Sequence, residues 1–367
     1  MKTISRQMLA EDLRRLGVRE GDCVMLHSSL SSLGRVDGGA ETVVEAFLDA
    51  LGEQGTLLTP AFTEGAWTEH LAMPDCRDAC PREFCPSRWP SHEGAIPNAA
   101  LARPGALRSC HPTHSWVANG ARAEEMLRDN QHTPTLCGRG NPFEKLVEGD
   151  GCIVTLGVGV NTITLWHYFE DLLEVPYLGH YHAAQRHLSY CTAGRRIQYE
   201  FPGIMQDVVR ASGIMHFGRA GRAEAGLMRA RTFRRFMATI MSDDPYCFVV
   251  RPPDRHCGEL VLDALRKAAA MLRAWRQRPC DELPAIVWPG GKDDAIVRED
   301  CPAFAGWHDV GDDMVPLCRA NDRHPHLFRL GGVFNDWGKA TCGRCSWHHR
   351  HPPQNADANV SDADEKA

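Results

Sequence analysis

The stretch Leu26–Leu51 constrains the fold of this chain more than any other part of its sequence. The apolar run Cys23–Leu26 at its start predicts a short buried strand. A loop of small and hydroxyl-bearing residues follows, and then apolar residues recur every three or four positions, which predicts a helix. These apolar positions are Val43, Val44, Phe47, Leu48 and Leu51. A helix that begins after such a loop points backbone N–H groups and the positive end of its dipole at one place, which suits a phosphate group.

The loop itself contains neither the dinucleotide-binding pattern G-x-G-x-x-G nor the Walker pattern G-x-x-x-x-G-K-[ST]. On this stretch alone, an ordinary strand–loop–helix connection explains the residues about as well as a phosphate site does. Features elsewhere in the chain must decide between the two interpretations.

Strands and helices alternate through the first half of the chain. Apolar runs predict buried strands at Thr56–Ala61 and Cys152–Leu156, and helical periodicity predicts helices at Glu41–Leu51 and Ala121–Asp129. The segment before Gly17 predicts a further, amphipathic helix. Because alternation of this kind favours an α/β fold, we expect an α/β sandwich with a largely parallel central sheet.

The second half of the chain is less regular. Alternating residues predict a strand at Arg195–Phe201, paired with His187–Thr192. The stretch Gly218–Met241 predicts a helix, and Glu259–Arg278 predicts another. The expected core residues of the first of these helices are Leu227, Phe233, Phe236, Met237 and Ile240.

Composition shifts divide the chain into four parts. Two consecutive prolines, Pro252 and Pro253, end a first domain that we place at residues 1–250. We expect a linker and helix at 251–279 and a small, loop-rich, Cys/His/Trp-rich module at 280–350. The polar and acidic residues 351–367 predict a disordered tail.

The module carries the sequence pattern of a metal site. Cys342 and Cys345 form a C-x-x-C pair, which is half of a tetrahedral zinc site. Cys301 and Cys318 can complete a structural zinc site, and the other candidates are Cys280, His308, His348 and His349. A set of buried free thiols packed among tryptophans is the alternative.

Overall composition limits the class of protein. With 367 residues, of which 43% are hydrophobic, the chain can bury a sizeable core. A net charge of −6 disfavours nucleic acid as a partner, and no apolar run approaches the roughly 18 residues of a membrane span. The first residues lack the apolar region of a secretory signal, so we expect a cytoplasmic protein whose fifteen cysteines are thiols or metal ligands. The oligomeric state is left open.

One histidine stands out as an acid–base group, because two carboxylates follow it at helical spacing. In TITLWHYFEDLL, His167 begins a predicted helix, and Glu170 and Asp171 lie three and four residues later on the same face. One carboxylate can orient the imidazole and stabilise its protonated form, while the other can attract a cationic amine. This arrangement suits direct transfer of an acyl group from a thioester to an amine, which needs a base for the amine proton. A histidine with a purely structural role is the alternative.

Five blocks of the sequence resemble the aminoglycoside 3-N-acetyltransferase family, in that family's order. They are HSSLSSLGRVDGG, GTLLTPAFT, GAIPNAALARPGALRSCHPTHSWVANG, NPFEKL and GVGVNTITLWHYFE, and the resemblance covers about residues 1–246. It implies an acetyl-CoA-dependent N-acetyltransferase whose serine-rich loop holds the pantetheine and phosphates of the coenzyme. The loop residues implied are His27, Ser28, Ser29, Ser31, Ser32, Gly34, Val36, Gly38 and Gly39.

The third block implies further contacts with the coenzyme. In the family it borders the acyl-CoA tunnel, which implies that Ser115 lies near the thioester end, with His111 beside it. We also expect Arg108 to pair with a coenzyme phosphate, the alternative being an ordinary surface arginine. His114 is either a second acid–base group or a histidine that only packs.

The catalytic motif of the family, roughly Asp-x-x-Thr-x-x-His-x-x-Glu, matches Asn161, Thr164, His167 and Glu170. The resemblance implies that His167 is the general base and that Glu170 is its partner or anchors the amine. Asn161 stands where the family usually has Asp.

A second departure concerns the amine. Asn98 stands where the family commonly has Glu, and Glu64 can replace some of that charge. We expect the substrate, an aminoglycoside or a similar cationic amine, to be bound by Glu64, Asn98, Asn161 and Asp171. A narrower variant keeps the chemistry but makes the substrate a biosynthetic intermediate or an amino-acid-like metabolite. A non-catalytic coenzyme- or ligand-binding module, with the Cys/His tail used for assembly, is the alternative from another class, and a metal-dependent hydrolase ranks last.

Overall fold

The computed structural model describes residues 3–62, 90–109, 114–130, 137–173, 180–185, 188–193, 202–245, 247–248, 257–285, 304–309 and 314–318. These residues fall into two compact units. The first unit contains the helices and the strands up to β9. The second contains an antiparallel pair, β10 (Phe304–Asp309) and β11 (Met314–Cys318).

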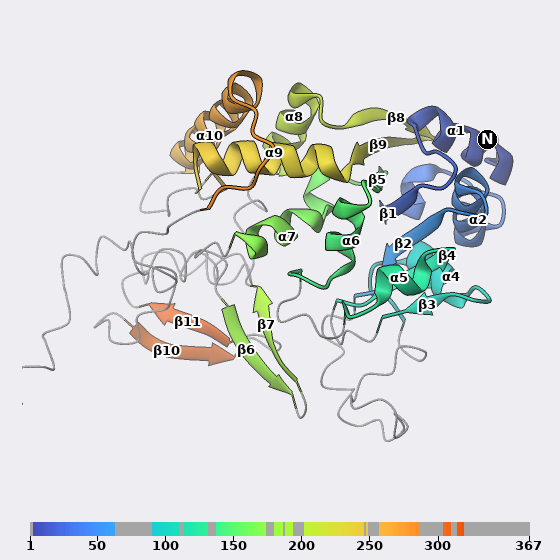
Figure 1. Cartoon of the computed structure of the whole chain (residues 1–367), viewed down its shortest axis with the longest axis horizontal. Helices are drawn as coiled ribbons and strands as arrows, with labels where there is room; N and C mark the ends of the chain where they lie inside the picture. Colours follow the sequence, from blue (N-terminus) through green and yellow to red (C-terminus); the bar gives the residue numbers. More distant parts are fainter. Residues whose placement is uncertain are drawn as a thin grey trace, which may run out of the picture. The chain divides into compact units, whose positions relative to one another are not determined.

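The elements of the first unit follow the chain in the order shown in Figure 1. Its helices are α1 (Arg6–Leu16), α2 (Gly39–Leu51), α4 (Ala95–Ala102), α5 (Ala123–Leu127), α6 (Pro142–Glu148), α7 (Leu165–Leu172), α8 (Pro202–Ser212), α9 (Ala230–Asp243) and α10 (Cys257–Gln277), with 3-10 turns η1 (Leu30–Leu33) and η3 (Val160–Thr162). Its strands are β1 (Cys23–Ser28), β2 (Thr56–Pro60), β3 (Leu107–Arg108), β4 (Trp116–Gly120), β5 (Cys152–Leu156), β6 (His180–Gln185), β7 (Leu188–Ala193), β8 (His216–Ala220) and β9 (Ala223–Arg229).

Seven strands form the central sheet, in the order β3-β4-β2-β1-β5-β9-β8. The strands predicted around residues 23, 56 and 152 are confirmed, and they are the three central ones, β1, β2 and β5. They run parallel to one another, whereas the remaining neighbours pair antiparallel. The α/β class is therefore confirmed, but the expectation of a largely parallel sheet is wrong. Each edge of the sheet is a pair of consecutive antiparallel strands, β3–β4 or β8–β9, and the inner strand of each pair also runs antiparallel to its central neighbour.

The hairpin β8–β9 explains part of this error. The sequence predicts one helix over Gly218–Met241, but the first part of this stretch belongs to these two strands and helix α9 begins only at Ala230. Leu227 therefore lies on β9, while Phe233 and Phe236 are buried on α9 as expected. Strand β7 pairs with β6, and the strand expected at residues 195–201 lies outside the described residues.

Helices cover both faces of the sheet, as the alternation of side chains along its strands requires. On one face, Val24 and Leu26 of β1 belong to a buried cluster with Leu13 of α1 and Phe47 of α2. Val117 of β4 joins this cluster. The next residue back, Trp116, faces the other way and its ring meets Phe143 of α6 at a centroid distance of 5.2 Å. Buried side chains therefore pack on both faces of the sheet.

The second face is built from aromatic contacts between helices. Trp166 of α7 packs edge-on against Phe233 of α9, with 4.4 Å between ring centroids, and against Phe248 at 5.7 Å. Phe236 of α9 meets Trp275 of α10 at 5.6 Å. Helix α10 also contacts α8, which Figure 1 shows beside it. These contacts fix α7, the helix that carries His167, against α9 and Phe248.

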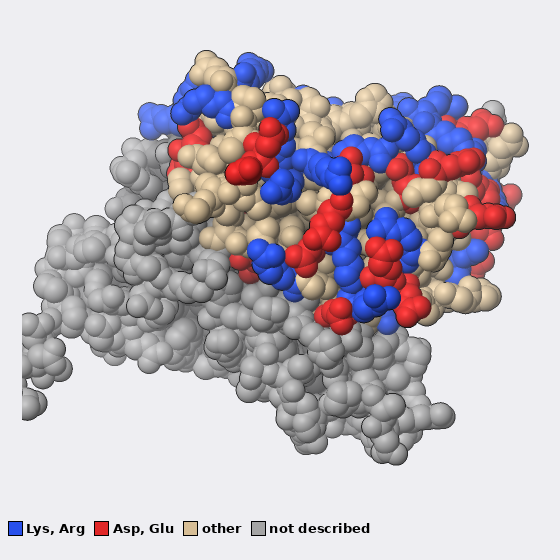
Figure 2. All heavy atoms as spheres, in the orientation of Figure 1, with Lys and Arg blue, Asp and Glu red and all other residues tan. Residues whose placement is uncertain are grey.

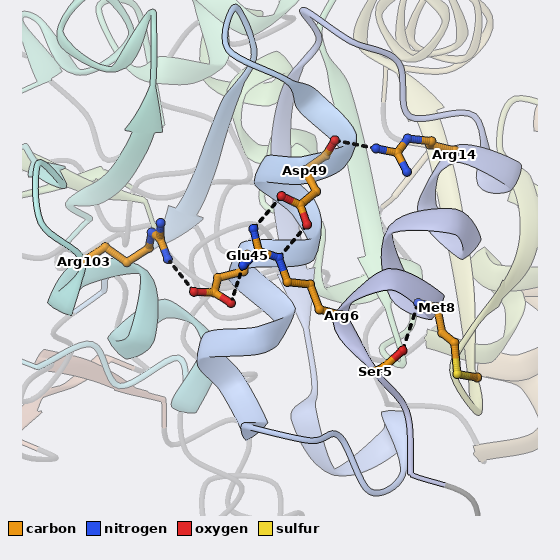
Figure 3. A network of polar contacts seen from close by, with 7 residues as sticks. All are labelled: Ser5, Arg6, Met8, Arg14, Glu45, Asp49 and Arg103. Atoms are coloured by element: carbon orange, nitrogen blue, oxygen red, sulfur yellow. Dashed lines mark hydrogen bonds and ion pairs between the residues drawn. The ribbon is translucent and has the colours of Figure 1, made fainter.

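An ionic network joins α1 to α2 (Figure 3). Arg6 donates two hydrogen bonds to the carboxylate of Asp49, at 2.5 and 2.6 Å, and one to Glu45 at 2.9 Å. Arg14 donates to the backbone oxygen of Asp49 at 2.6 Å, and Arg103 lies 3.7 Å from Glu45. The network connects α1, α2 and the end of α4 on the outside of the first face.

Replacing Arg6 with alanine is expected to lower the free energy of unfolding by roughly 1 kcal/mol or less, because the Arg6 side chain is 47% exposed and exposed ion pairs contribute little. The loss should shrink in about 1 M NaCl, because salt screens exposed charges. Urea denaturation at low and high salt measures both effects. A loss several times larger, or one that salt leaves unchanged, would contradict this account of the network.

Charges of both signs are interleaved on the face of the described residues that Figure 2 shows. Local ion pairs among the described residues join Arg122 to Glu125 and Arg139 to Glu144. No described helix is long and apolar enough to cross a membrane.

Candidate active site

The candidate active site lies along the side of the sheet formed by the carboxyl ends of the parallel strands, which is the edge meant from here on. Strand β1 ends at Ser28, β2 at Pro60 and β5 at Leu156. The antiparallel strands β4 and β9 begin at the same edge, because Trp116 pairs with Pro60 and Ala225 pairs with Leu156. In open α/β sheets, ligands bind beyond the carboxyl ends of the parallel strands.

The serine-rich loop after β1 is fastened to the end of β5. The N–H of Ser29 donates to the Leu156 oxygen at 2.9 Å, and Ser32 Oγ donates to the Gly157 oxygen at 3.0 Å. A Cβ atom placed on Gly157 would lie 2.3 Å from Ser32 Cβ, so this close approach requires glycine. Ser31 and Ser32 are exposed, and the hydroxyls of Ser29 and Ser31 lie 3.1 Å apart. The loop therefore presents hydroxyl groups to solvent beside the end of β5.

The rest of the predicted coenzyme loop leads into α2. Gly34 follows η1, and Val36 forms an isolated parallel bridge with Ile4. Gly38 is the N-cap of α2 and Gly39 is its first residue. Because glycine has no side chain with which to cap a helix, Gly38 makes no hydrogen bond of its own to the N–H groups of the first turn.

His27 lies inside the sheet and not on this loop. Its side chain is 5% exposed, and its ring meets that of Trp116 edge-on at 6.4 Å. Among the described residues, His27 Nε2 has no hydrogen-bond partner. Burial lowers the pKa of His27 to about 4, so its imidazole is neutral at pH 7. A contact between His27 and the coenzyme stays a prediction.

His167 and Glu170 meet on α7, as their spacing predicts. His167 Nδ1 lies 3.5 Å from Glu170 Oε2, and the His167 side chain is 19% exposed while that of Glu170 is wholly buried. Burial lowers the pKa of His167 to about 3, and the charge of nearby His114 adds to the effect. The imidazole is therefore neutral at pH 7, which is the form that can accept a proton.

His114 belongs to the same region. It immediately precedes Ser115 and is 8% exposed. Its ring stacks on Phe62, with 4.5 Å between centroids, just beyond the end of β2. Its backbone oxygen accepts a hydrogen bond from Asn130 Nδ2 at 3.2 Å. His114 is thus held by packing and by its backbone at the edge where β2 ends and β4 begins.

Arg108 and Ser115 converge on the residue that follows β2. Arg108 Nη2 donates to the Ala61 oxygen at 2.6 Å, and Arg108 Nε donates to Ser115 Oγ at 3.0 Å. Ser115 Oγ in turn donates to the Ala61 oxygen at 2.7 Å. These bonds engage two of the nitrogens of Arg108 with the protein itself. Coenzyme binding by Arg108 or Ser115 stays a prediction.

The loop between β5 and α7 is held by residues from a distant part of the chain. The Gly157 N–H donates to the backbone oxygen of Glu224 at 2.8 Å, and the Val160 N–H donates to the side-chain oxygen Gln206 Oε1 at 2.9 Å. Trp166 Nε1 donates to the Val160 oxygen at 3.0 Å. Gln206 and Glu224 are positioning residues that no sequence pattern singled out, because they act only through long-range contacts.

The other residues of the catalytic motif lie on this loop and on α7. Asn161 is half-buried in η3. Thr164 is the N-cap of α7, and its backbone oxygen accepts a hydrogen bond from the His167 N–H at 3.0 Å. Asp171 follows Glu170 and is half-buried. The structure therefore places all the motif residues within one loop–helix unit after β5.

The side chain of Asn98 bonds to the turn before α4, and a contact between Asn98 and a substrate stays a prediction. Its Oδ1 accepts from the Ser91 N–H at 2.8 Å, and its Nδ2 donates to the oxygens of Ser91 and Gly94 at 2.9 and 2.8 Å. These three bonds hold the turn that leads into α4. The predicted site residues Glu64 and His111 lie outside the described residues.

The predicted zinc site cannot be placed. Cys301, Cys342 and Cys345 lie outside the described residues, and Cys318 is the last residue of β11. Within the described part of the chain, no three His, Cys, Asp or Glu side chains are grouped so as to hold a metal. The further candidate Cys280 donates its thiol to the Glu282 oxygen at 3.1 Å. A structural zinc in the module stays a prediction.

Comparison with known proteins decides the family. A family model described as aminoglycoside 3-N-acetyltransferase matches residues 25–242, which is more than half of the chain. The chain belongs to this family. The resemblance that the sequence blocks indicate is confirmed, and the protein is an acyltransferase.

Relatives and solved structures agree with this acetyltransferase assignment. Aminoglycoside N(3)-acetyltransferase VIII of Streptomyces fradiae is 31% identical over 271 residues, which cover 64% of this chain and 90% of the relative. The apoenzyme structure of aminoglycoside acetyltransferase AAC(3)-IVa matches with a TM-score of 0.59 and 25% identity, covering 73% of this chain and 99% of that one. A structure of AAC-IIIb with CoASH matches with a TM-score of 0.51 and 26% identity, covering 77% and 100%.

The site of this acetyltransferase fits an acyl-CoA donor in its chemistry. The exposed hydroxyls of Ser31 and Ser32 can bond polar groups of such a donor. A neutral, largely buried imidazole at His167 suits the acceptance of an amine proton. These features lie at the same edge of the sheet.

Proposed function

We propose that this acetyltransferase transfers an acetyl group from acetyl-CoA to an amine of an aminoglycoside or a similar cationic amine. The observation that carries the proposal is the pair formed by His167 and wholly buried Glu170 at the edge where β1, β2 and β5 end. The family assignment supports the reaction class, and the relative from Streptomyces fradiae bears the name of an aminoglycoside N(3)-acetyltransferase.

The chain's own groups account for the proton that the reaction releases. Acetyl-CoA supplies the acetyl group as a thioester, and the amine nitrogen forms a bond to its carbonyl carbon while the bond from that carbon to sulfur breaks. His167 accepts the proton that the amine nitrogen loses. Coenzyme A leaves as the thiolate and is released as the thiol once it takes up a proton.

Glu170 has a defined part in this scheme. The 3.5 Å separation between His167 Nδ1 and Glu170 Oε2 is longer than a normal hydrogen bond while the imidazole is neutral. When His167 takes a proton, a carboxylate at this distance attracts the new positive charge. Glu170 is therefore the group that favours the protonated imidazole, against the burial and the His114 charge that lower the pKa of His167. Asp171 is the carboxylate that attracts a cationic amine in this scheme.

The reaction is measured as thiol release from acetyl-CoA in the presence of a panel of aminoglycosides and simpler amines. We expect turnover with at least one aminoglycoside, with one acetyl group gained per molecule of thiol released. Turnover only with simpler amines would keep the chemistry but overturn the aminoglycoside as acceptor, and would point to Asn161 as a residue that changed the substrate.

The alternative is a non-catalytic coenzyme-binding module on the same scaffold. His167, Thr164 and Glu170 argue against it, because a module that only binds has no use for a buried base. Tight binding of coenzyme A together with no turnover of any amine would favour this alternative over the enzyme.

A further inference from the structure

The turn between β8 and β9 packs directly on the serine-rich loop. It consists of Gly221 and Arg222, which separate the last residue of β8 from the first of β9. The Arg222 N–H donates to the Leu33 oxygen at 3.0 Å, at the end of η1. The Gly221 N–H donates to Asp12 Oδ2 of α1 at 2.7 Å, which fixes the turn from its other side. The turn is therefore held by hydrogen bonds on two sides at the same sheet edge.

The side chain of Arg222 crosses the loop at Gly34. A Cβ atom placed on Gly34 would lie 2.7 Å from Arg222 Cδ and 3.2 Å from Arg222 Nε. Gly34 also has a φ of 88°, a conformation that residues with side chains rarely adopt. The glycine thus makes room for the arginine stem, and the exposed Arg222 has its guanidinium beside the loop.

The serine-rich loop and the turn that carries Arg222 are also joined through Gly157. Ser32 is two residues before Gly34 and contacts Gly157. Gly157 bonds to the oxygen of Glu224, which is two residues after Arg222. Three segments that are far apart in sequence, around residues 32, 157 and 222, therefore meet at one place.

We propose that Arg222 binds the phosphate groups of coenzyme A. The inference rests on the proposed function, in which the serine-rich loop holds the coenzyme. A guanidinium presents several N–H donors in a fixed plane that matches the oxygens of a phosphate, and it stays charged at every physiological pH. The exposed hydroxyls of Ser31 and Ser32 hold the adjoining part of the coenzyme. Arg222 is thus a binding residue for the donor and takes no part in the acyl transfer.

The test compares donors with and without phosphates. Arg222→Met keeps the length and the packing of the stem over Gly34 but removes the charge. We expect this variant to raise the KM for acetyl-CoA by roughly tenfold or more, because charge-assisted hydrogen bonds are lost. We expect kcat to change less than about twofold, because the base His167 is untouched. With S-acetylpantetheine, which has no phosphate, wild type and variant should have the same KM.

The control variant is Arg219→Met, which removes an exposed arginine from β8 of the same hairpin. It should leave the KM for both donors unchanged. Acetyl-dephospho-CoA locates the contact: a loss that persists with this donor assigns Arg222 to the diphosphate, and a loss that disappears assigns it to the 3′-phosphate. An equal loss with S-acetylpantetheine, or an unchanged KM for acetyl-CoA, would overturn the proposal.

Calorimetry with coenzyme A itself separates this proposal from the proposed function. The dissociation constant of coenzyme A should rise by a similar factor in Arg222→Met, whether or not any amine is acetylated. If wild type binds coenzyme A but acetylates no amine, the proposed function fails while the inference on Arg222 is still decided. Equal affinities of wild type and variant would overturn the inference alone.

Discussion

Replacing His167 with glutamine lowers kcat and kcat/KM for acetyl transfer by roughly 10²- to 10⁴-fold, which is the usual contribution of a positioned general base. Glutamine keeps much of the side-chain volume and polarity, but it cannot accept the amine proton. The loss is expected in kcat because proton acceptance belongs to the transition state, whereas binding of acetyl-CoA should be nearly unchanged. Thiol release under saturating acetyl-CoA and amine measures the effect.

The matched control is His216→Gln, which replaces an exposed histidine on β8. It should retain wild-type kcat. Thermal unfolding of both variants shows whether they fold, and His167→Asn serves as a second replacement if the glutamine variant does not. A His167→Gln enzyme that folds and retains more than about a third of wild-type kcat would show that another group accepts the proton.

The second large effect concerns stability at acid pH and involves His27. Burial lowers the pKa of His27 to about 4 from an ordinary value near 6.5. At a pH between these two pKa values, His27 is protonated in the unfolded chain but neutral in the folded protein. The contribution of His27 to stability is therefore present above pH 6.5 and is lost as the pH falls toward 4. Linkage gives a loss of about 2 kcal/mol between pH 7 and pH 5 from this residue.

Replacing His27 with glutamine removes this pH dependence. The free energy of unfolding of wild type should fall more steeply from pH 7 to pH 5 than that of His27→Gln, by about 2 kcal/mol. His167 adds a loss of the same sign in both proteins, because burial lowers its pKa as well. Urea denaturation at several pH values measures the difference. The free energy of unfolding of His216→Gln should depend on pH as that of wild type does. The same pH dependence for wild type and His27→Gln would show that His27 takes up its proton at the same pH in the folded protein as in the unfolded chain.

Local patterns predict the centre of the fold well. The apolar runs at Cys23–Leu26 and Cys152–Leu156 are short and uniformly buried, and they form β1 and β5 with almost unchanged bounds. Helix α2 follows from its apolar periodicity, and α10 begins and ends within two residues of its expected bounds. In each case the signal lies within the element itself.

The edges of the sheet could not be predicted in the same way. Strand β9 holds residues that suit a helix about equally well, and its identity depends on pairing with β5 and β8. That pairing joins segments about seventy residues apart, such as Leu156 and Ala225. No local pattern carries this information, so the sequence predicts one helix where a hairpin and a helix occur.

In the candidate site, too, local spacing predicts some contacts, whereas others depend on long-range packing. The pair of His167 and Glu170 lies within one helix, so its spacing alone predicts the contact. The stacking of His114 on Phe62 and the support of Val160 by Gln206 depend on the folded chain. The bonds by which Asn98 holds the turn before α4 likewise depend on the folded chain.

The most direct test of the central claim follows the acetyl group itself. The protein is incubated with acetyl-CoA carrying a ¹³C-labelled acetyl group and with an aminoglycoside, and both products are measured by mass spectrometry and NMR. The account predicts one labelled acetyl group in amide linkage to an amine nitrogen for each coenzyme A thiol released, and neither product with His167→Gln. Thiol release without an acetylated amine would mean hydrolysis, and a fully active His167→Gln enzyme would place the base elsewhere. Either result would contradict the account.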